Sequence, residues 1–141
     1  MKTTVTVSVN FSGAHRLVGV NSVCGNLHGY FYCAEFTFIA DKLNKTGMII
    51  EFESAKQKLK KWLDENWDHT VILHKSDKKL GEAIAKITGQ KIFYLDVNPT
   101  TENKAEYLIK TVCPKLFKTS GAKCVKVHLQ ETPENSVSIE H

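Results

Sequence analysis

The order of apolar and polar positions predicts a chain that begins and ends with strands. From Val5 to Phe11 every second residue is apolar, which is the period-two pattern of a half-buried strand. Further strands are predicted at His28 to Ala40, Met48 to Ile50, Lys91 to Leu95, Val125 to Leu129 and Val137 to Ile139.

Three helices are predicted between these strands. Apolar residues recur at helical spacing from about Glu53 to Trp67 and again from Ser76 to Gly89, where the glycine suits a left-handed C-cap. A third helix begins within the segment Asn98 to Asn103, and Pro114 must kink or end it. Strands and helices do not alternate regularly, so the predicted class is α+β with an antiparallel sheet. A parallel, doubly wound sheet is the weaker alternative.

Composition limits the kinds of function that the chain can have. Its 141 residues, 42% hydrophobic and 24% charged, suit a single domain over residues 1–141 with one core. A net charge of +4 is too small to indicate a nucleic-acid surface. No apolar run approaches a membrane span, and the first residues lack the apolar core of a signal peptide. We therefore expect a cytoplasmic protein that binds neither nucleic acid nor a membrane.

The four cysteines, at positions 24, 33, 113 and 124, form no pair with metal-site or redox spacing, and we expect free thiols. Three of them lie inside predicted strands or helices, where a packing role is expected. Cys24 instead lies in a loop from Ser12 to Leu27, together with His15, Arg16 and three glycines. So many reactive side chains in one loop indicate a functional segment.

Two histidines and a tyrosine form a candidate metal site. His28 and Tyr30 stand two residues apart on a predicted strand and so project from one face, and we expect His15 to arrive from the preceding loop. Three imidazoles with one open position are typical of catalytic zinc, but here the third residue is a tyrosine. Taken alone, the two histidines are better explained as hydrogen-bonded loop residues.

Six motifs along the chain together resemble the 6-pyruvoyltetrahydropterin synthase family. They are Phe11 to Leu17, Cys24 to Gly29, Gly47 to Phe52, Asp68-His69, Asn98 to Asn103 and Glu131-Thr132. Each motif is weak alone, but their order and spacing are specific and cover nearly the whole chain. Glu51 stands where the family has an aspartate.

The resemblance implies a T-fold subunit, which is an antiparallel sheet with helices on one face. Such subunits assemble through their sheets into a trimeric barrel, and often a hexamer, with active sites at the subunit interfaces. The strand from His28 to Ala40 fits this arrangement, because it is apolar or aromatic on both faces and would have long edges to protect.

The resemblance also implies a zinc-dependent lyase that acts on 7,8-dihydroneopterin triphosphate. His15 and His28 match two of the family's three zinc ligands, and the third falls on Tyr30. Three hypotheses remain open: Tyr30 binds zinc as a phenolate, another side chain replaces it, or the site binds metal poorly and the protein has diverged.

By the same resemblance, Cys24 is the proton-abstracting residue, and Asp68 and His69 form the dyad that assists it. A thiol does this work only as a thiolate, and a carboxylate beside an imidazole fixes the tautomer that relays the proton. Without the family match, a small buried cysteine is the better explanation of Cys24.

Glu131 matches the family's pterin anchor, since a carboxylate can accept two parallel N–H donors from the ring. It follows the apolar face of a predicted strand, so we expect it at the rim of the core. Thr101 and Glu102 lie in a motif that, by resemblance, borders the pterin pocket, although helix capping alone would explain them. Arg16 or one of several lysines would meet the triphosphate.

The resemblance leaves the product open between 6-carboxy-5,6,7,8-tetrahydropterin, of the deazapurine (queuosine) pathway, and 6-pyruvoyltetrahydropterin. Two other kinds of protein remain possible. One is a pterin-binding protein that has lost the zinc chemistry because of Tyr30, and the other is a structural oligomer without a pocket.

Overall fold

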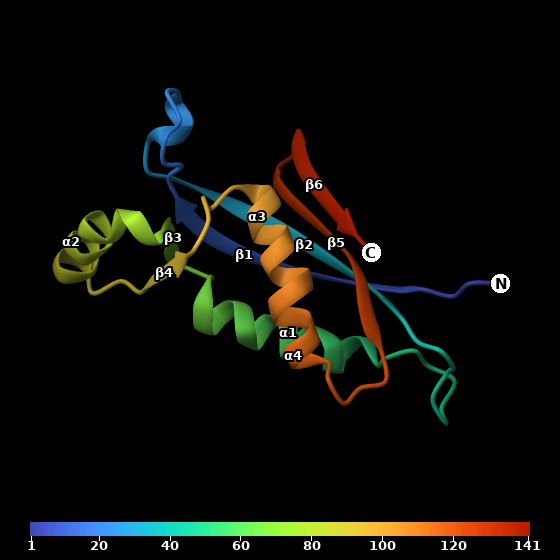
Figure 1. Ribbon diagram of the computed structural model, residues 1–141. Coiled ribbons are helices and arrows are strands. Elements are labelled where there is room, and N and C mark those ends of the chain that lie inside the picture. The colour runs from blue at the N-terminus through green and yellow to red at the C-terminus, as the bar shows by residue number, and fades with distance from the viewer.

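A six-stranded sheet is the framework of the protein in the computed structural model, which describes residues 1–141 (Figure 1). The strands are β1 (Val5–His15), β2 (His28–Ile39), β3 (Thr70–His74), β4 (Ile92–Leu95), β5 (Lys123–Thr132) and β6 (Asn135–Glu140). Their order across the sheet is β4-β3-β1-β2-β5-β6. The pairs β1–β2, β2–β5 and β5–β6 are antiparallel, whereas β3 runs parallel to both β1 and β4.

Helices pack against one face of this sheet. They are α1 (Phe52–Asn66), α2 (Lys78–Thr88), α3 (Thr101–Tyr107) and α4 (Cys113–Leu116), with a π-helical turn at Leu108–Val112 and 3₁₀ turns at Val23–Gly25 and Lys75–Asp77. In Figure 1, α1 and the α3–α4 segment lie across the sheet, and α2 lies beyond its β4 edge. The predicted α+β class with helices on one face is therefore confirmed. No helix is of the length and apolar character that crossing a bilayer requires.

The sheet is mixed and not wholly antiparallel, because β3 was not predicted. Residues Thr70 to Leu73 are all buried, so this strand has no polar alternation. An unbroken buried run is typical of a strand covered on both faces, and a parallel pair needs a crossover such as α2 between β3 and β4. The short strand predicted at Met48 to Ile50 is wrong. These residues lie outside the regular elements, and Ile49 and Ile50 are buried as core residues.

The predicted helices are present with small changes at their ends. Gly89 caps α2 in the left-handed conformation, at a φ of 71°, as its position indicated. The third helical segment changes from α to π just before Pro114 and ends at Leu116. A proline has no N–H and its ring crowds the carbonyl four residues earlier, so an uninterrupted α-helix through Pro114 would be strained.

The face of β1 and β2 that lies under the helices changes character along its length. At one end it is fully apolar, with Val7, Phe36 and Phe38 at 2% exposure or less. At the other end the same face carries His15 and His28, which are paired directly across the two strands. The sheet therefore places two imidazoles at the margin of the hydrophobic core.

Candidate functional site

Two histidine side chains face each other at the end of the β1–β2 pair. Their Nε2 atoms are 3.2 Å apart. The expectation that His15 comes from a loop is wrong, because β1 continues four residues past Phe11 and His15 is its last residue. This extension fixes both histidines on regular strands, where the backbone pairing sets their separation.

Each imidazole has its other nitrogen against a backbone carbonyl. His28 Nδ1 lies 2.6 Å from Asn26 O, and His15 Nδ1 lies 2.8 Å from Pro99 O. A carbonyl only accepts, so the Nδ1 of His28 carries its proton and its Nε2 presents a lone pair. Burial, followed by the charge of Lys104, lowers the pKa of His15 to about 4. His15 is therefore neutral at pH 7, as a metal ligand must be.

The two imidazoles have the spacing of adjacent ligands around one zinc ion. Zinc–nitrogen bonds of about 2.0–2.1 Å at a tetrahedral angle place two ligand nitrogens about 3.3 Å apart. Hydrogen bonds from the remote ring nitrogens to carbonyls are also usual for metal-bound histidine. These two residues thus fit a zinc ion as two of its ligands.

Tyr30 lies beside both imidazoles. Its ring centroid is 5.1 Å from that of His28 and 5.9 Å from that of His15. Burial and the charges of Glu131 and Cys24 raise the pKa of Tyr30, so its phenol keeps its proton unless a cation displaces it. No three His, Cys, Asp or Glu side chains come together as a metal-binding group. The identity of a third protein ligand therefore stays a prediction.

A cavity of about 560 Å³ opens beside the two histidines. It is lined by His15, Leu17, Cys24, His28, Thr100, Thr101, Glu102, Glu131, Glu134, Asn135, Ser136 and Val137. Six of the nine residues singled out from the sequence are in this list. The lining contains three glutamates and neither lysine nor arginine, so the cavity itself favours donor groups over phosphates.

Cys24 reaches the cavity from the loop between β1 and β2. The Leu17 N–H donates to Cys24 O at 3.0 Å, and Asn98 holds Val18 through two hydrogen bonds of 2.9 Å. Gly25 is required here, since a Cβ at this position would lie 2.9 Å from a backbone oxygen. These contacts hold Cys24 in the cavity wall, although the loop between β1 and β2 forms no strand.

Glu131 and Thr101 meet in the lining of the same cavity. Thr101 lies in the first turn of α3, and its hydroxyl donates to Glu131 Oε2 at 2.5 Å. Glu131 follows the buried Val127 and Leu129 on the same face of β5, so its carboxylate emerges at the rim of the core, as its position in the strand indicated.

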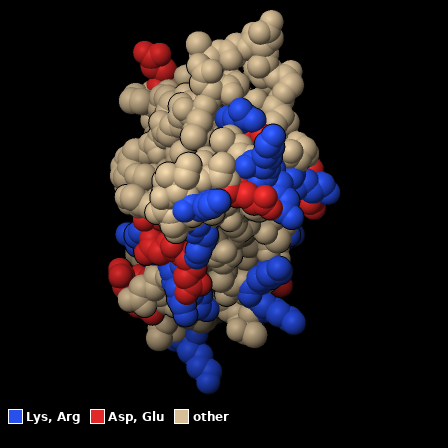
Figure 2. Space-filling view, turned by 90° about the vertical axis from the view of Figure 1, so that its left-hand side faces the viewer, with Lys and Arg blue, Asp and Glu red and all other residues tan.

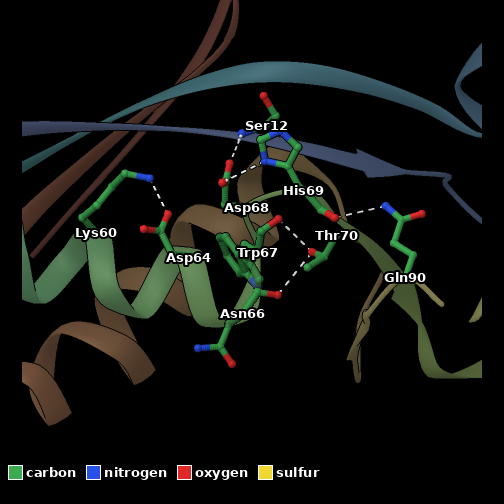
Figure 3. A network of polar contacts seen from close by, with 9 residues as sticks. All are labelled: Ser12, Lys60, Asp64, Asn66, Trp67, Asp68, His69, Thr70 and Gln90. Atoms are coloured by element: carbon green, nitrogen blue, oxygen red, sulfur yellow. Dashed lines mark hydrogen bonds and ion pairs between the residues drawn. The ribbon is translucent and has the colours of Figure 1, made fainter. Parts of the chain in front are cut away.

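The Asp68–His69 dyad forms, but it lies outside this cavity. Figure 3 shows that His69 Nδ1 lies against Asp68, at 2.8 Å from Oδ2, and that Asp68 Oδ1 accepts the Ser12 N–H, also at 2.8 Å. The His69 side chain is 80% exposed and borders a separate depression that also contains Tyr30 and Phe31. Within one chain, the structure does not bring the dyad and Cys24 into a common site.

Arg16 forms an ion pair with Asp77 and does not line the cavity. Its guanidinium donates to both carboxylate oxygens of the buried Asp77, at 2.6 and 2.5 Å. Hydrogen bonds from Arg16 hold the pKa of Asp77 below its usual range. The Arg16 charge is thereby neutralised within the chain, and the residue is a poor candidate for binding triphosphate.

The sequence interpretation missed Lys104, a fully buried lysine behind the cavity. Its Nζ lies 2.8 Å from His15 Nδ1 and 2.7 Å from the Tyr32 hydroxyl. A signal was present in the sequence, since Lys104 follows Thr101 by three residues and precedes Ala105 of the predicted buried stripe.

Comparisons with known proteins find relatives along almost the whole chain. A family model described as 6-pyruvoyl tetrahydropterin synthase matches residues 4–141. The 6-carboxy-5,6,7,8-tetrahydropterin synthase of Rickettsia felis is 42% identical over 131 residues, which are 93% of this chain and 95% of that protein.

Solved structures show the same fold. An uncharacterized protein from Wolinella succinogenes superimposes with a TM-score of 0.83 at 18% identity, covering 100% of this chain and 99% of that one. A variant of 6-pyruvoyltetrahydropterin synthase from Plasmodium vivax gives 0.70 at 14% identity, over 99% and 98% of the two chains.

Proposed function

Since this chain belongs to the 6-pyruvoyl tetrahydropterin synthase family, a family of lyases, we propose that it converts 7,8-dihydroneopterin triphosphate to 6-carboxy-5,6,7,8-tetrahydropterin. The reaction consumes one water molecule and releases triphosphate and acetaldehyde. The observation that carries the proposal is the single cavity that combines Cys24, two imidazoles and the Glu131–Thr101 pair. The carboxy product is favoured over the pyruvoyl one by the name of the Rickettsia felis relative.

Glu131 is the anchor for the pterin ring in this proposal. Its carboxylate accepts the 2-amino and ring N–H groups together, an arrangement of two parallel hydrogen bonds that also fixes the ring's orientation. The hydroxyl of Thr101 holds one carboxylate oxygen from behind. The ring then lies with its side chain directed toward Cys24 and the histidines, which line the same cavity.

His15 and His28 would hold a zinc ion, with Tyr30 as the nearest candidate for the third ligand. Bound zinc supplies a Lewis acid for the substrate's side-chain hydroxyls. Cys24 removes a proton from the substrate side chain, and the loop contacts that fix its backbone keep the sulfur in the cavity wall.

The Asp68–His69 dyad would come from a second copy of the chain. In support, His69 is 80% exposed, and Phe31 beside it is 67% exposed, which is unusual for a phenylalanine that faces only water. Val23, next to Cys24, is 77% exposed. Assembly through the sheets into a trimer or hexamer would cover these residues and complete the site.

The charge distribution suits such an interface. Residues 17–27, at the top of Figure 1, contain no charged side chain, and Figure 2 shows an upper region almost free of charge above a lower region with many lysines, arginines and acids. Depletion of charge is typical of the centre of a protein–protein contact. The cations that bind triphosphate must lie outside the cavity of one chain, since its lining has none.

Product analysis tests the proposal directly. Purified protein, supplied with zinc, is incubated with 7,8-dihydroneopterin triphosphate, and the products are identified by mass. We expect 6-carboxy-5,6,7,8-tetrahydropterin with acetaldehyde and triphosphate. Absence of triphosphate release with zinc present would refute the lyase assignment.

Mixing two inactive variants tests whether the site is shared between copies. Cys24→Ala and His69→Ala chains are unfolded together and refolded, or coexpressed, so that mixed oligomers form. If Cys24 and the dyad come from different chains, about a quarter of the sites in an equal mixture are intact and activity returns to roughly that level. No recovery would show that both residues must come from one chain.

Metal content distinguishes the three hypotheses for the third ligand. The parent, Tyr30→Phe and Tyr30→His are purified without chelator or a nickel column, and zinc is measured per chain. Stoichiometric zinc in the parent, lost in Tyr30→Phe, supports phenolate ligation. Stoichiometric zinc that survives Tyr30→Phe indicates another ligand. Zinc only in Tyr30→His indicates a diverged site.

The raised pKa of Tyr30 and the absence of a third conventional ligand favour one alternative, a pterin-binding protein without the zinc chemistry. Ligand binding stabilises the folded state by mass action, so a bound pterin raises the melting temperature in either case. A rise in melting temperature without turnover supports this alternative, and no rise with any pterin excludes both.

A further inference from the structure

The turn that presents His69 lies between α1 and β3. The Thr70 N–H donates to Trp67 O at 3.2 Å, which makes His69 the third residue of a four-residue β-turn. Its φ of 56° is left-handed, a conformation for which this turn position favours glycine or asparagine. A histidine keeps such a conformation only where surrounding contacts hold it.

Both sides of the His69 backbone are held by hydrogen bonds to distant segments. Its N–H donates to Ser12 O of β1 at 2.7 Å. Its carbonyl accepts from the side-chain amide of Gln90, with Nε2 3.1 Å from the oxygen (Figure 3). A carbonyl only accepts, so the amide nitrogen of Gln90, and not its oxygen, must face it. Gln90 and His69 also border the same depression.

Gln90 is itself fixed by the end of α2 and the start of β4. Its N–H donates to Thr88 Oγ1 at 3.1 Å, directly after the left-handed cap at Gly89. Two residues further along, Ile92 is paired with Val71 of β3. Gln90 thus lies between a helix cap and a strand pairing, which limit the movement of its backbone.

We propose that Gln90 is a positioning residue for the Asp68–His69 dyad. Ser12 and Gln90 together fix the His69 backbone, and this backbone directs Nδ1 to Asp68 Oδ2 at 2.8 Å. The carboxylate keeps the imidazole proton on Nδ1, so Nε2 is the nitrogen that can accept a proton from another group. Because the His69 side chain is 80% exposed, its orientation depends on Asp68 and on these backbone contacts more than on packing. This inference rests on the proposed role of the dyad in proton transfer.

Gln90→Met removes the amide donor, keeps the length of the side chain and adds no charge. In zinc-loaded protein we expect kcat for the triphosphate substrate to fall about tenfold, because a loosely held group spends less time in its reactive orientation. Gln90 does not line the cavity, so KM should stay within about twofold. The dissociation constant of neopterin, which keeps the pterin ring and lacks the triphosphate, should also be unchanged. Gln57→Met, at an exposed position of α1, is the matched control and should react as the parent does.

A double variant separates an effect through His69 from a general loss of structure. In a His69→Asn background the backbone remains and the imidazole is absent. There Gln90→Met should lower kcat no further, because its effect acts through the missing ring. A purely structural glutamine would lower kcat by the same factor in both backgrounds, and that result would overturn the proposal.

Amide hydrogen exchange measures the positioning without any turnover. The His69 N–H is protected by its hydrogen bond to Ser12 O and should exchange about tenfold faster in Gln90→Met. Gln90→Glu should have the same effect, because its carboxylate repels the His69 carbonyl oxygen. Peptides from β2 are the internal reference and should exchange as in the parent. Unchanged exchange at His69 in both variants would refute the role of Gln90.

The outcomes distinguish this inference from the function beneath it. If the parent releases no triphosphate with zinc present, the proposed function fails, and hydrogen exchange alone decides whether Gln90 holds His69. If the parent is active and Gln90→Met has a normal kcat, only the role of Gln90 is refuted. If Gln90→Met does not fold, a normal kcat in Gln90→Glu refutes that role.

Discussion

The cavity beside His15 and the corner at Asp68 and His69 differ in almost every physical respect. His15 is 3% exposed, whereas the His69 side chain is 80% exposed. The cavity is built from β1, β2, α3, β5, β6 and the loop that carries Cys24, and hydrogen bonds between distant segments hold its walls. The corner is built from two adjacent residues that rest on β1.

His69 also has an unusual backbone, with a φ of 56°, the only positive value at a residue other than glycine. Its N–H donates to Ser12 O at 2.7 Å, which helps to hold this conformation. Such conformations persist when the surroundings enforce them, and they are frequent at functional sites. The cavity is therefore enclosed by hydrogen-bonded segments of one chain, whereas the corner presents a firmly held imidazole to solvent, and in the proposed function a second copy of the chain would cover it.

The largest expected effect is on the cavity side. Cys24→Ser should lower turnover by about 10²–10⁴-fold, the usual contribution of a positioned acid–base group, and leave neopterin binding intact. Cys33→Ser is the matched control, because Cys33 is also a half-buried free thiol but lies outside the cavity. Equal turnover of the two variants in a steady-state assay would exclude a chemical role for Cys24.

At the Asp68–His69 corner, His69→Asn should lower turnover by about 10²-fold. Its free energy of unfolding should stay within roughly 0.5 kcal/mol of the parent's. Asparagine tolerates a positive φ, so this variant removes the imidazole without straining the backbone. Turnover and urea unfolding are measured on the same preparation. A clear loss of stability would mean that the side chain has a structural role instead.

Unlike the substitution of His69, a substitution of Asp68 should lower the stability of the fold. Asp68→Ala leaves the Ser12 N–H without its acceptor and should lower the free energy of unfolding by about 1–3 kcal/mol. Burial would raise the pKa of Asp68, but hydrogen bonds from Ser12 and His69 hold it below its usual value. The stabilisation is therefore present above the ordinary pKa of an aspartate and is lost as the pH falls through the lower, folded value. Unfolding curves at several acid pH values should converge for the two proteins.

The smallest effect concerns the ion pair at the base of the Cys24 loop. Asp77→Asn should cost about 1–2 kcal/mol at neutral pH, since Arg16 is partly exposed and solvent screens the pair. Hydrogen bonding to Arg16 lowers the pKa of Asp77, so this stability is also lost only on acidification. Turnover should change little if Arg16 does not contact substrate. A large rise in KM would instead indicate that Arg16 binds the triphosphate.

Much of the fold was predictable from local patterns. Alternation and helical spacing indicated most of the elements, because a side chain's burial on a strand or helix repeats with the element's own period. β3 was missed because a strand covered on both faces has no such period, and Met48 to Ile50 was misread because a short apolar run fits a buried bend equally well.

The sequence alone determined which residue types are present for chemistry, and their spacing was enough for a family resemblance that the comparisons confirm. Only the tertiary structure decided which of them meet. It brought His15 and His28 to 3.2 Å, placed Cys24 and Glu131 in one cavity, kept Asp68 and His69 outside it and enclosed Lys104. The reason is physical, since these contacts join segments far apart in the chain. Their distances depend on how the sheet and helices pack, which no local pattern encodes.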